Sequence, residues 1–256
     1  MFTGTSSARR QSDKTARTED WAASGRLIAA VAHELKNPIQ ALGNALFLLE
    51  KCLRGDALPN RYLKAAQEEL GRMKEITASL LSSYRESPPR SAINIPAVLD
   101  SILEFYDHKI KFKRIQICRR YSSVSPVEAS AGEIRQVFTN LVINALEAVP
   151  TGGKVVVHAF SSRDWSRPER DGIRVVIGDN GPGIHPEHRR RLFEPFFTTK
   201  TSRGTGLGLW VSQVFMERLG SRVRLRTSTR PHRAGTCFSV FLPFDRKYAY
   251  PGPIVY

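Results

Sequence analysis

The sequence predicts a multi-domain α+β protein, in which a helical hairpin that dimerises into a four-helix bundle precedes a two-layer α/β sandwich with a mixed sheet. Three observations predict this arrangement. The chain has 256 residues, enough for two domains that each bury a core. Its first third contains two helical stripes of apolar residues. The rest alternates helix and strand patterns without strict βαβ order.

The hairpin is expected over residues 25–86. Apolar residues recur at intervals of three and four over 27–53, which is the period of one helix face. The segment 55–59 (GDALP) breaks this pattern, and a second stripe at heptad spacing follows over 63–84. Because each helix has only one apolar stripe, two copies of the hairpin are needed to enclose a core. A homodimer is therefore expected.

The second domain is expected over 92–244, after a linker-like SPPR segment at 87–90. A flexible segment at 1–24 and a tail at 245–256 complete the chain. Helical patterns cover 97–108, 132–148 and 206–219, and strand patterns cover 114–121, 154–160, 172–179, 221–228 and 235–243. This mixture predicts a mixed sheet with helices packed on one face.

Composition and cysteine usage indicate a soluble protein of the cytoplasm. The chain is 41% hydrophobic and 25% charged, and it has no apolar run long enough to span a bilayer, so no transmembrane segment is expected. The first 24 residues lack the apolar centre of a secretion signal. Cys52, Cys118 and Cys237 are far apart without CxxC spacing, which argues against a zinc site and a disulfide framework.

The formal net charge of +15 raises the question of an acidic partner. Basic residues are spread over several expected elements, including 109–120 and the alternating Arg222, Arg224 and Arg226. No basic recognition helix or aromatic stacking motif accompanies them, so no specific nucleic-acid partner is expected.

Two asparagines lie four residues apart in the expected helix over 132–148. Asn140 and Asn144 interrupt an otherwise apolar pattern, so both amides project to the same side. They are either helix-face amides bonded to a neighbouring loop or oxygen ligands that complete the shell of a phosphate-bound Mg²⁺.

Three further segments could bind a ligand. Asp179 ends a buried strand and is followed by Gly181 and Gly183, as in an ordinary turn or in a site where the carboxylate accepts a hydrogen bond from an amine such as that of adenine. The glycine-rich GTGLGL at 204–209 opens a helix, where backbone amides favour phosphate. Between them, 185–203 combines arginines, phenylalanines and Lys200, which is typical of a mobile lid.

Five segments in order, VAHELKNP, NLVINALEA, DNGPGI, FEPFFTTK and GTGLGL, make the chain resemble a sensor histidine kinase of a two-component system. The resemblance covers about 25–242. It implies a phosphoacceptor hairpin followed by an ATPase domain of the gyrase, heat-shock-chaperone and mismatch-repair type, with ATP and Mg²⁺ as cofactors. Asn144 is implied as the principal Mg²⁺ ligand with Asn140 beside it, Asp179 reads adenine, and Lys200 holds phosphate. The residues implied in ATP binding are Asn140, Asn144, Asp179, Gly181, Gly183, Ile184, Phe193, Lys200, Gly204, Thr205, Gly206, Leu207, Gly208 and Thr236.

An ATP site changes the interpretation of VAHELKNPIQAL at 31–42. The expected buried seam places His33 and Asn37 on the solvated side of the helix. Neutral imidazole can attack the γ-phosphorus of ATP while Glu34 holds the proton of the other ring nitrogen. Zinc hydrolysis of the H-E-x-x-H type is disfavoured, because Asn37 replaces the second histidine. For Asn37 the resemblance implies a phosphatase role.

The resemblance thus implies a kinase that autophosphorylates His33 and passes the phosphoryl group to a response-regulator receiver domain. One departure is Glu147, where many members have a basic residue. Another is that no sensor domain precedes the hairpin, so the signal comes from a separate sensor protein or the chain is one part of a larger system. Two alternatives remain: an ATP-driven conformational clamp, and a basic scaffold or nucleic-acid-binding protein with a vestigial ATP site.

Overall fold

The computed structural model describes residues 89–200 and 205–244, together with 39–40, 42–44, 46–47, 67, 70–71, 73 and 77. The chain divides into two compact units, Met1–Glu86 with Gly252–Tyr256, and Ser87–Pro251. The expectations for 1–24, for 245–256 and for the segment 31–38 lie outside the described residues.

The described residues of the first unit before position 78 are all helical. They include members of both predicted apolar stripes. Ile39 and Leu70 are buried, each with 8% of its surface exposed, whereas Leu42 and Met73 are 58% and 46% exposed. The predicted stripes are therefore only partly covered within one chain.

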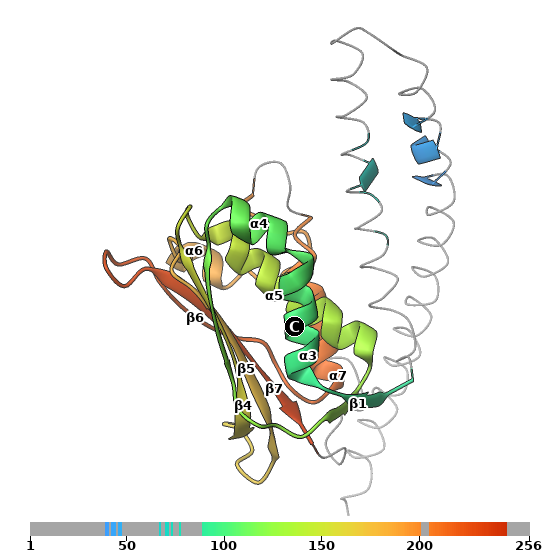
Figure 1. Cartoon of the computed structure of the whole chain (residues 1–256), viewed down its shortest axis with the longest axis vertical. Coiled ribbons are helices and arrows are strands. Elements are labelled where there is room, and N and C mark those ends of the chain that lie inside the picture. The colour runs from blue at the N-terminus through green and yellow to red at the C-terminus, as the bar shows by residue number, and fades with distance from the viewer. Residues whose placement is uncertain are drawn as a thin grey trace, which may run out of the picture. The chain divides into compact units, whose positions relative to one another are not determined.

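The second unit is built on a five-stranded sheet with the order β2-β4-β5-β7-β6 (Figure 1). Its strands are β2 (Gln116–Tyr121), β4 (Lys154–Arg163), β5 (Asp171–Asp179), β6 (Arg224–Ser228) and β7 (Gly235–Pro243). β2 pairs with β4 in parallel, and the other neighbours are antiparallel. The predicted mixed sheet is confirmed.

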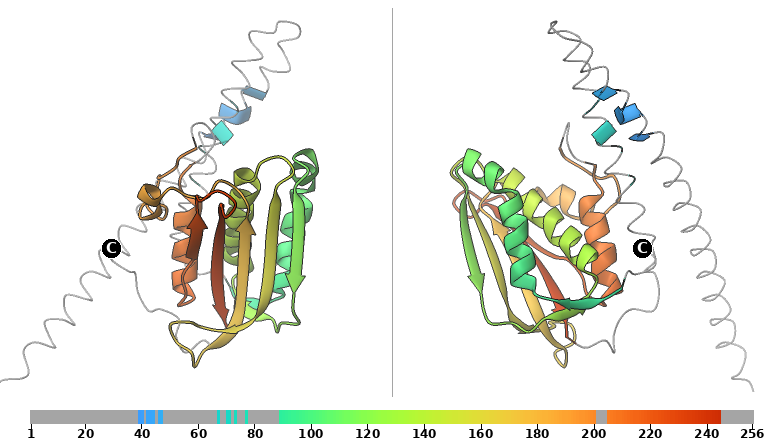
Figure 2. Two further views of the ribbon diagram at one scale, coloured as in Figure 1. Left: turned by 90° about the vertical axis from the view of Figure 1, so that its left-hand side faces the viewer. Right: turned by 45° about the vertical axis from the view of Figure 1, so that its right-hand side comes forward.

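Three helices, α3 (Ile95–Phe105), α5 (Ala131–Ala148) and α7 (Gly208–Arg218), lie on one face of this sheet (Figures 1 and 2). The core between the two layers contains alternating strand residues and apolar helix residues that are at most 1% exposed, among them Val155, Val157, Ile177, Phe138 and Phe215. Side chains of a strand alternate between its two faces, so one set of each strand faces the helices. This confirms the two-layer sandwich.

Local capping explains where α3 and α5 begin. The Asn94 side chain accepts a hydrogen bond from the Ala97 amide at the start of α3. The Ser130 hydroxyl accepts one from the Glu133 amide at the start of α5. Such caps satisfy amides that have no partner within the helix. They fix α5, the helix that contains both asparagines of interest.

The structure differs from the sequence prediction in several short elements. The predicted helix 97–108 is two helices, α3 and α4 (Asp107–Phe112), separated by Tyr106. β1 (Ser91–Ile93) and β3 (Val127–Ala129) pair in a second, two-stranded sheet, and α6 (Pro186–Arg189) lies within the predicted lid. These pieces are too short to produce a clear period, which is why the sequence pattern does not reveal them.

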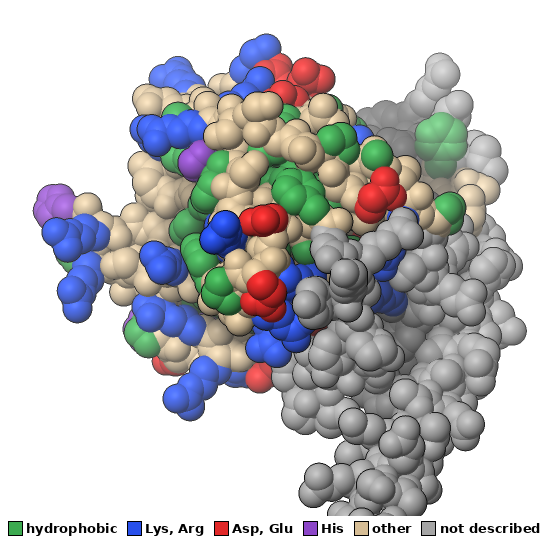
Figure 3. Space-filling model, turned by 90° about the horizontal axis from the view of Figure 1, so that it is seen from below, with side chains coloured by type: hydrophobic (Ala, Val, Ile, Leu, Met, Phe, Trp, Pro, Cys, Tyr) green, Lys and Arg blue, Asp and Glu red, His purple; other side chains and the backbone are tan. Residues whose placement is uncertain are grey.

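On the face of the second unit that Figure 3 draws, the basic residues do not form one continuous stripe. On the face drawn in Figure 3, Lys and Arg side chains are scattered among apolar and acidic groups. Within 109–120, Lys113 donates hydrogen bonds to the carbonyls of Leu146 and Val149 at 2.8 and 2.6 Å, and so caps the end of α5. Arg119 lies 3.6 Å from Asp100. Lys113 and Arg119 therefore form contacts within the fold.

Among the described helices, none has the length and apolar character required to cross a membrane.

Candidate active site

A row of polar residues crosses the sheet where β5, β7 and β6 lie side by side. The register places Asp179 opposite Thr236, and Thr236 opposite Thr227. The Asp179 Oδ1 atom accepts hydrogen bonds from the amides of Gly181 and Thr236, at 2.9 and 3.3 Å. Among the described residues, Oδ2 has no hydrogen-bond partner. One carboxylate oxygen is thus fixed by the backbone, and the other is available to a ligand.

Burial raises the pKa of the Asp179 carboxyl, and the hydrogen bonds from Gly181 and Thr236 partly offset this. A half-buried acceptor with a raised pKa is typical of functional sites.

Thr227 is a site residue that the sequence analysis missed. Its hydroxyl accepts a hydrogen bond from the Ile184 amide at 2.8 Å and donates one to the Gly235 carbonyl at 2.9 Å. It also lies 3.3 Å from the Thr236 hydroxyl. Thr227 therefore ties the loop after β5 to the β6–β7 hairpin. In the sequence Thr227 alternates with Arg224 and Arg226, so its side chain lies on the other face of the strand. This alternation could have indicated the role of Thr227.

Two glycines after Asp179 are required by the backbone. Gly183 has φ +77°, and a Cβ atom there would lie 2.0 Å from the Ser228 carbonyl oxygen. A Cβ atom on Gly181 would lie 2.8 Å from the carbonyl oxygen of Ala148, at the end of α5. The loop can approach α5 and the β6–β7 hairpin this closely only because side chains are absent.

The start of α7 offers backbone amides. Its N-cap residue, Leu207, makes no side-chain capping bond, and the Thr205 hydroxyl accepts a hydrogen bond from the Leu207 amide at 3.4 Å. Gly206 has φ +68°, and a Cβ atom there would lie 2.3 Å from the backbone of Phe196. An uncapped helix start favours an anion. Gly204 lies outside the described residues.

Asn140 holds the start of α7. Its Nδ2 donates to the Gly208 carbonyl at 2.8 Å and to the Ser212 hydroxyl at 3.1 Å, while its Oδ1 accepts from Gln136 at 3.1 Å. The first alternative for the asparagine pair was a helix-face amide bonded to a neighbouring loop; Asn140 is such an amide, but its partners Gly208 and Ser212 belong to helix α7. A metal-ligand role for Asn140 stays a prediction.

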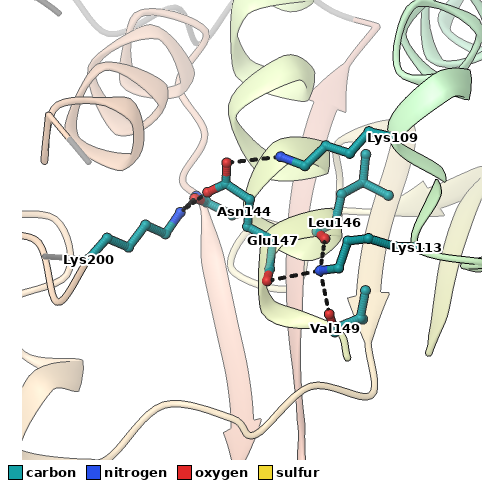
Figure 4. Close-up of polar contacts among 7 residues, drawn as sticks. All are labelled: Lys109, Lys113, Asn144, Leu146, Glu147, Val149 and Lys200. Atoms are coloured by element: carbon teal, nitrogen blue, oxygen red, sulfur yellow. Dashed lines mark hydrogen bonds and ion pairs between the residues drawn. The ribbon is translucent and has the colours of Figure 1, made fainter. Parts of the chain in front are cut away.

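Asn144 lies in a cluster of charged residues (Figure 4). The Lys200 ammonium donates to Asn144 Oδ1 at 2.9 Å and contacts Glu147 Oε2 at 2.6 Å. Lys109 contacts the other carboxylate oxygen, Oε1, at 3.1 Å. Burial favours a higher pKa for Glu147, but hydrogen bonds and charge from Lys200 and then Lys109 outweigh it and lower the pKa. Glu147 is therefore ionised.

The phenylalanines of the predicted lid are in different environments. Phe193 is half-buried, and Phe196 is 60% exposed with φ 64°. Phe197 is half-buried, with the guanidinium of Arg191 4.5 Å from the centre of its ring. The lid therefore does not bury its three aromatic side chains together in this structure.

The residues around Asn144 suit a metal ion that takes most of its ligands from substrate phosphates and water. The described residues contain no group of three or more His, Cys, Asp or Glu side chains that could hold a metal ion. The Asn144 amide oxygen already contacts a cation, the ammonium of Lys200. Mg²⁺ commonly binds through few protein oxygens together with substrate phosphates and water. The residues fit such an ion if a nucleotide accompanies it.

His33, Glu34 and Asn37 lie outside the described residues. The structure thus brings together the predicted residues of α5, of the loop after β5, of the lid and of α7.

Two protein-family models match the chain. Residues 129–246 match the "Histidine kinase-, DNA gyrase B-, and HSP90-like ATPase" family, and residues 23–87 match the "His Kinase A (phospho-acceptor) domain". The fold and site therefore define an ATPase domain of this kind preceded by a phosphoacceptor domain.

Curated relatives agree with the two models. The chain is 28% identical over 250 residues to the signal transduction histidine-protein kinase AtoS of Escherichia coli K12, covering 96% of this chain and 39% of the relative. It is 31% identical over 235 residues to the sensor protein kinase PilS of Pseudomonas aeruginosa, covering 87% of this chain and 41% of the relative. The chain thus spans about two fifths of the length of these relatives. It belongs to the sensor histidine kinases of two-component systems.

Solved structures have the same fold. The catalytic domain of the histidine kinase ThkA, in a nucleotide-free form, is 29% identical with a TM-score of 0.52, covering 61% of this chain and 97% of that one. Full-length ShkA in complex with AMPPNP has a TM-score of 0.68 at 24% identity, covering 86% and 46% of the two chains. ThkA in complex with the response regulator TrrA has a TM-score of 0.59 at 24% identity, covering 95% and 68%.

Proposed function

We propose that this chain is an ATP- and Mg²⁺-dependent protein histidine kinase that autophosphorylates His33 and passes the phosphoryl group to an aspartate of a response-regulator receiver domain. The observation that carries the proposal is the convergence of the predicted segments on α5. Gly181 approaches the end of this helix, Asn140 bonds to Gly208 at the start of α7, and Lys200 bonds to Asn144. One helix thus links the loop after Asp179 to the lid and to the helix start suited to phosphate.

In this proposal, different site residues bind the adenine base, the phosphates and Mg²⁺. Asp179 Oδ2 accepts a hydrogen bond from the amino group of adenine, while its Oδ1 is held by the backbone. The amides at the start of α7 and the Lys200 ammonium bind phosphate oxygens. Asn144 supplies an amide oxygen to Mg²⁺, which when bound neutralises charge on the phosphates.

Phosphoryl transfer requires a neutral imidazole. A ring nitrogen of His33 forms a bond to the γ-phosphorus as the bond to the β–γ bridging oxygen breaks, and ADP leaves with that oxygen. Glu34 accepts a hydrogen bond from the other ring nitrogen and stabilises the charge that develops on the ring.

Homodimerisation, a cytoplasmic location and a sensor input extend this proposal. Leu42 and Met73 belong to the predicted apolar stripes and are exposed in the single chain, as expected if a second hairpin covers them. The domains proposed are a hairpin over 25–86 and an ATP-binding domain over 92–244. The signal reaches the kinase through a separate sensor protein or through another part of a larger system, and either route belongs to the same proposal.

The test uses the full chain and γ-labelled ATP with Mg²⁺. Wild-type protein is expected to gain label that is labile in acid and stable in base. His33→Gln should abolish labelling, whereas the matched control His108→Gln, which changes an exposed histidine of α4, should retain it. Label that persists in His33→Gln would refute the phosphoacceptor assignment. ATP turnover without protein label would instead favour the conformational clamp.

A second test concerns Asn37. An amide can orient a water molecule for attack on the phosphoaspartate of a docked regulator without acting as a nucleophile. Asn37→Ala should leave autophosphorylation near the wild-type rate and slow dephosphorylation of the regulator. The decay of purified phosphorylated regulator, followed with Mg²⁺ and each protein, measures the effect. Equal decay rates would contradict the phosphatase role.

A further inference from the structure

The oxygen that the proposed function assigns to Mg²⁺ contacts a cation of the chain itself. The Lys200 ammonium lies 2.9 Å from Asn144 Oδ1, and the same nitrogen lies 2.6 Å from Glu147 Oε2 (Figure 4). An ammonium group and a divalent cation repel each other strongly at such short range. Lys200 must therefore leave this position before a metal can bind to Asn144.

Glu147 determines where Lys200 rests. Glu147 lies three residues after Asn144 on α5, so the two side chains are neighbours on the helix surface. Its carboxylate forms one ion pair with Lys200, at 2.6 Å, and another with Lys109 of α4, at 3.1 Å. These ammonium groups lower the pKa of the Glu147 carboxyl. The shorter of the two ion pairs is the one to Lys200.

A third nearby ammonium group, that of Lys113, is bound differently from those of Lys200 and Lys109. Lys113 donates to backbone carbonyls of Leu146, Glu147 and Val149, at 2.8, 3.4 and 2.6 Å. These partners belong to the end of a helix and cannot move independently. Lys200 lies on a segment without regular structure, and its side chain is 42% exposed. Unlike Lys113, Lys200 can therefore move to a ligand.

We propose that Glu147 is a positioning residue that holds Lys200 against Asn144 and releases it to the phosphates when nucleotide binds. The inference rests on the proposed function and adds a step to it. Phosphate oxygens beside Asn144 attract Lys200 and repel Glu147, so the Lys200 ammonium exchanges the carboxylate for phosphate. Lys109 remains on Glu147 and neutralises part of the charge that Lys200 leaves behind.

If Lys200 exchanges Glu147 for phosphate, removing the Glu147 carboxylate should increase the affinity for nucleotide. Glu147→Gln keeps the shape of the side chain but removes both the ion pair that competes with phosphate and the repulsion of the phosphates. Nucleotide should bind roughly two- to fivefold more tightly, which is the range expected for an exposed charge interaction. The gain should shrink at high ionic strength, because salt screens such charges.

Calorimetric titration of the full-length chain with ADP and with a non-hydrolysable ATP analogue, each with and without Mg²⁺, tests this. The variants are Glu147→Gln, Lys200→Met and the double substitution. Lys200→Met alone should weaken binding, and in its background the gain from Glu147→Gln should be clearly smaller. The matched control is Asp171→Asn, which removes an exposed carboxylate paired with Arg163 at the start of β5 and should leave affinity unchanged.

Unchanged or weaker binding by Glu147→Gln would overturn the proposal, as would an equal gain in the Lys200→Met background. Thermal unfolding identifies a variant that fails to fold. If Glu147→Gln fails to fold, Glu147→Asp is used in its place. The shorter side chain keeps the charge but moves it away from Lys200, so a gain in nucleotide affinity is again expected. Wild-type protein that binds no nucleotide would refute the proposed function itself, whereas normal wild-type binding with no effect of the variants refutes only the role of Glu147.

Discussion

The assignment of Asp179 to adenine makes a sharp prediction for Asp179→Asn. The substitution keeps the size and shape of the side chain and can keep an oxygen at the Oδ1 position. That oxygen can still accept hydrogen bonds from the amides of Gly181 and Thr236. The change falls on Oδ2, which has no partner among the described residues. An NH₂ group replaces the free acceptor.

The expected loss follows from this geometry. A hydrogen bond to a charged acceptor contributes about 1.5–3 kcal/mol, and its replacement by two facing donors adds a desolvation penalty. We therefore expect ATP binding to weaken by about 2–3 kcal/mol, or roughly 30- to 150-fold. The fold should be preserved, because the backbone contacts of Oδ1 can be retained.

The assay compares ATP with inosine triphosphate, in which an oxygen replaces the amino group of the base. Asp179→Asn should bind ATP much more weakly than the wild type but should not lose affinity for inosine triphosphate, since the new amide can donate to that oxygen. Asp171→Asn is the matched control, because Asp171 begins the same strand and its exposed carboxylate pairs with Arg163. An equal loss for both nucleotides, or no loss for ATP, would refute the assignment.

Three further predictions concern stability. Gly183→Ala should lower the free energy of unfolding by more than about 2 kcal/mol in urea denaturation, because φ is +77° and the new Cβ would lie 2.0 Å from the Ser228 carbonyl oxygen. Arg218→Met should cost about 2 kcal/mol by the same measurement, since it leaves the buried Glu133 without its 2.7 Å ion pair between α5 and α7; a loss below about 0.5 kcal/mol would contradict this. The raised pKa of Asp179 means that the folded state retains a proton that the unfolded state loses. Stability should therefore fall as pH rises from the ordinary carboxyl pKa through the raised value, and Asp179→Asn should flatten that part of the pH profile.

The sequence alone determined the elements that depend on local pattern. The helical pattern over 132–148 and the strand patterns over 154–160, 172–179 and 221–228 agree with α5, β4, β5 and β6, because side-chain spacing sets which face of an element is buried. Gly181 and Gly183 were also recognisable, since a backbone that must approach other segments closely tolerates no side chain there.

Only the tertiary structure decided which side chains meet across the chain. Lys200 and Glu147 are 53 residues apart, and Ile184 and Thr227 are 43 residues apart. No local period relates such pairs, because their contacts depend on the path of the lid and on the register of β5, β7 and β6. Asn140 and Asn144 look equivalent in the sequence, four residues apart on one helix. The neighbours that tertiary folding supplies distinguish them: the start of α7 accepts a hydrogen bond from the amide of Asn140, whereas Asn144 accepts one from the Lys200 ammonium.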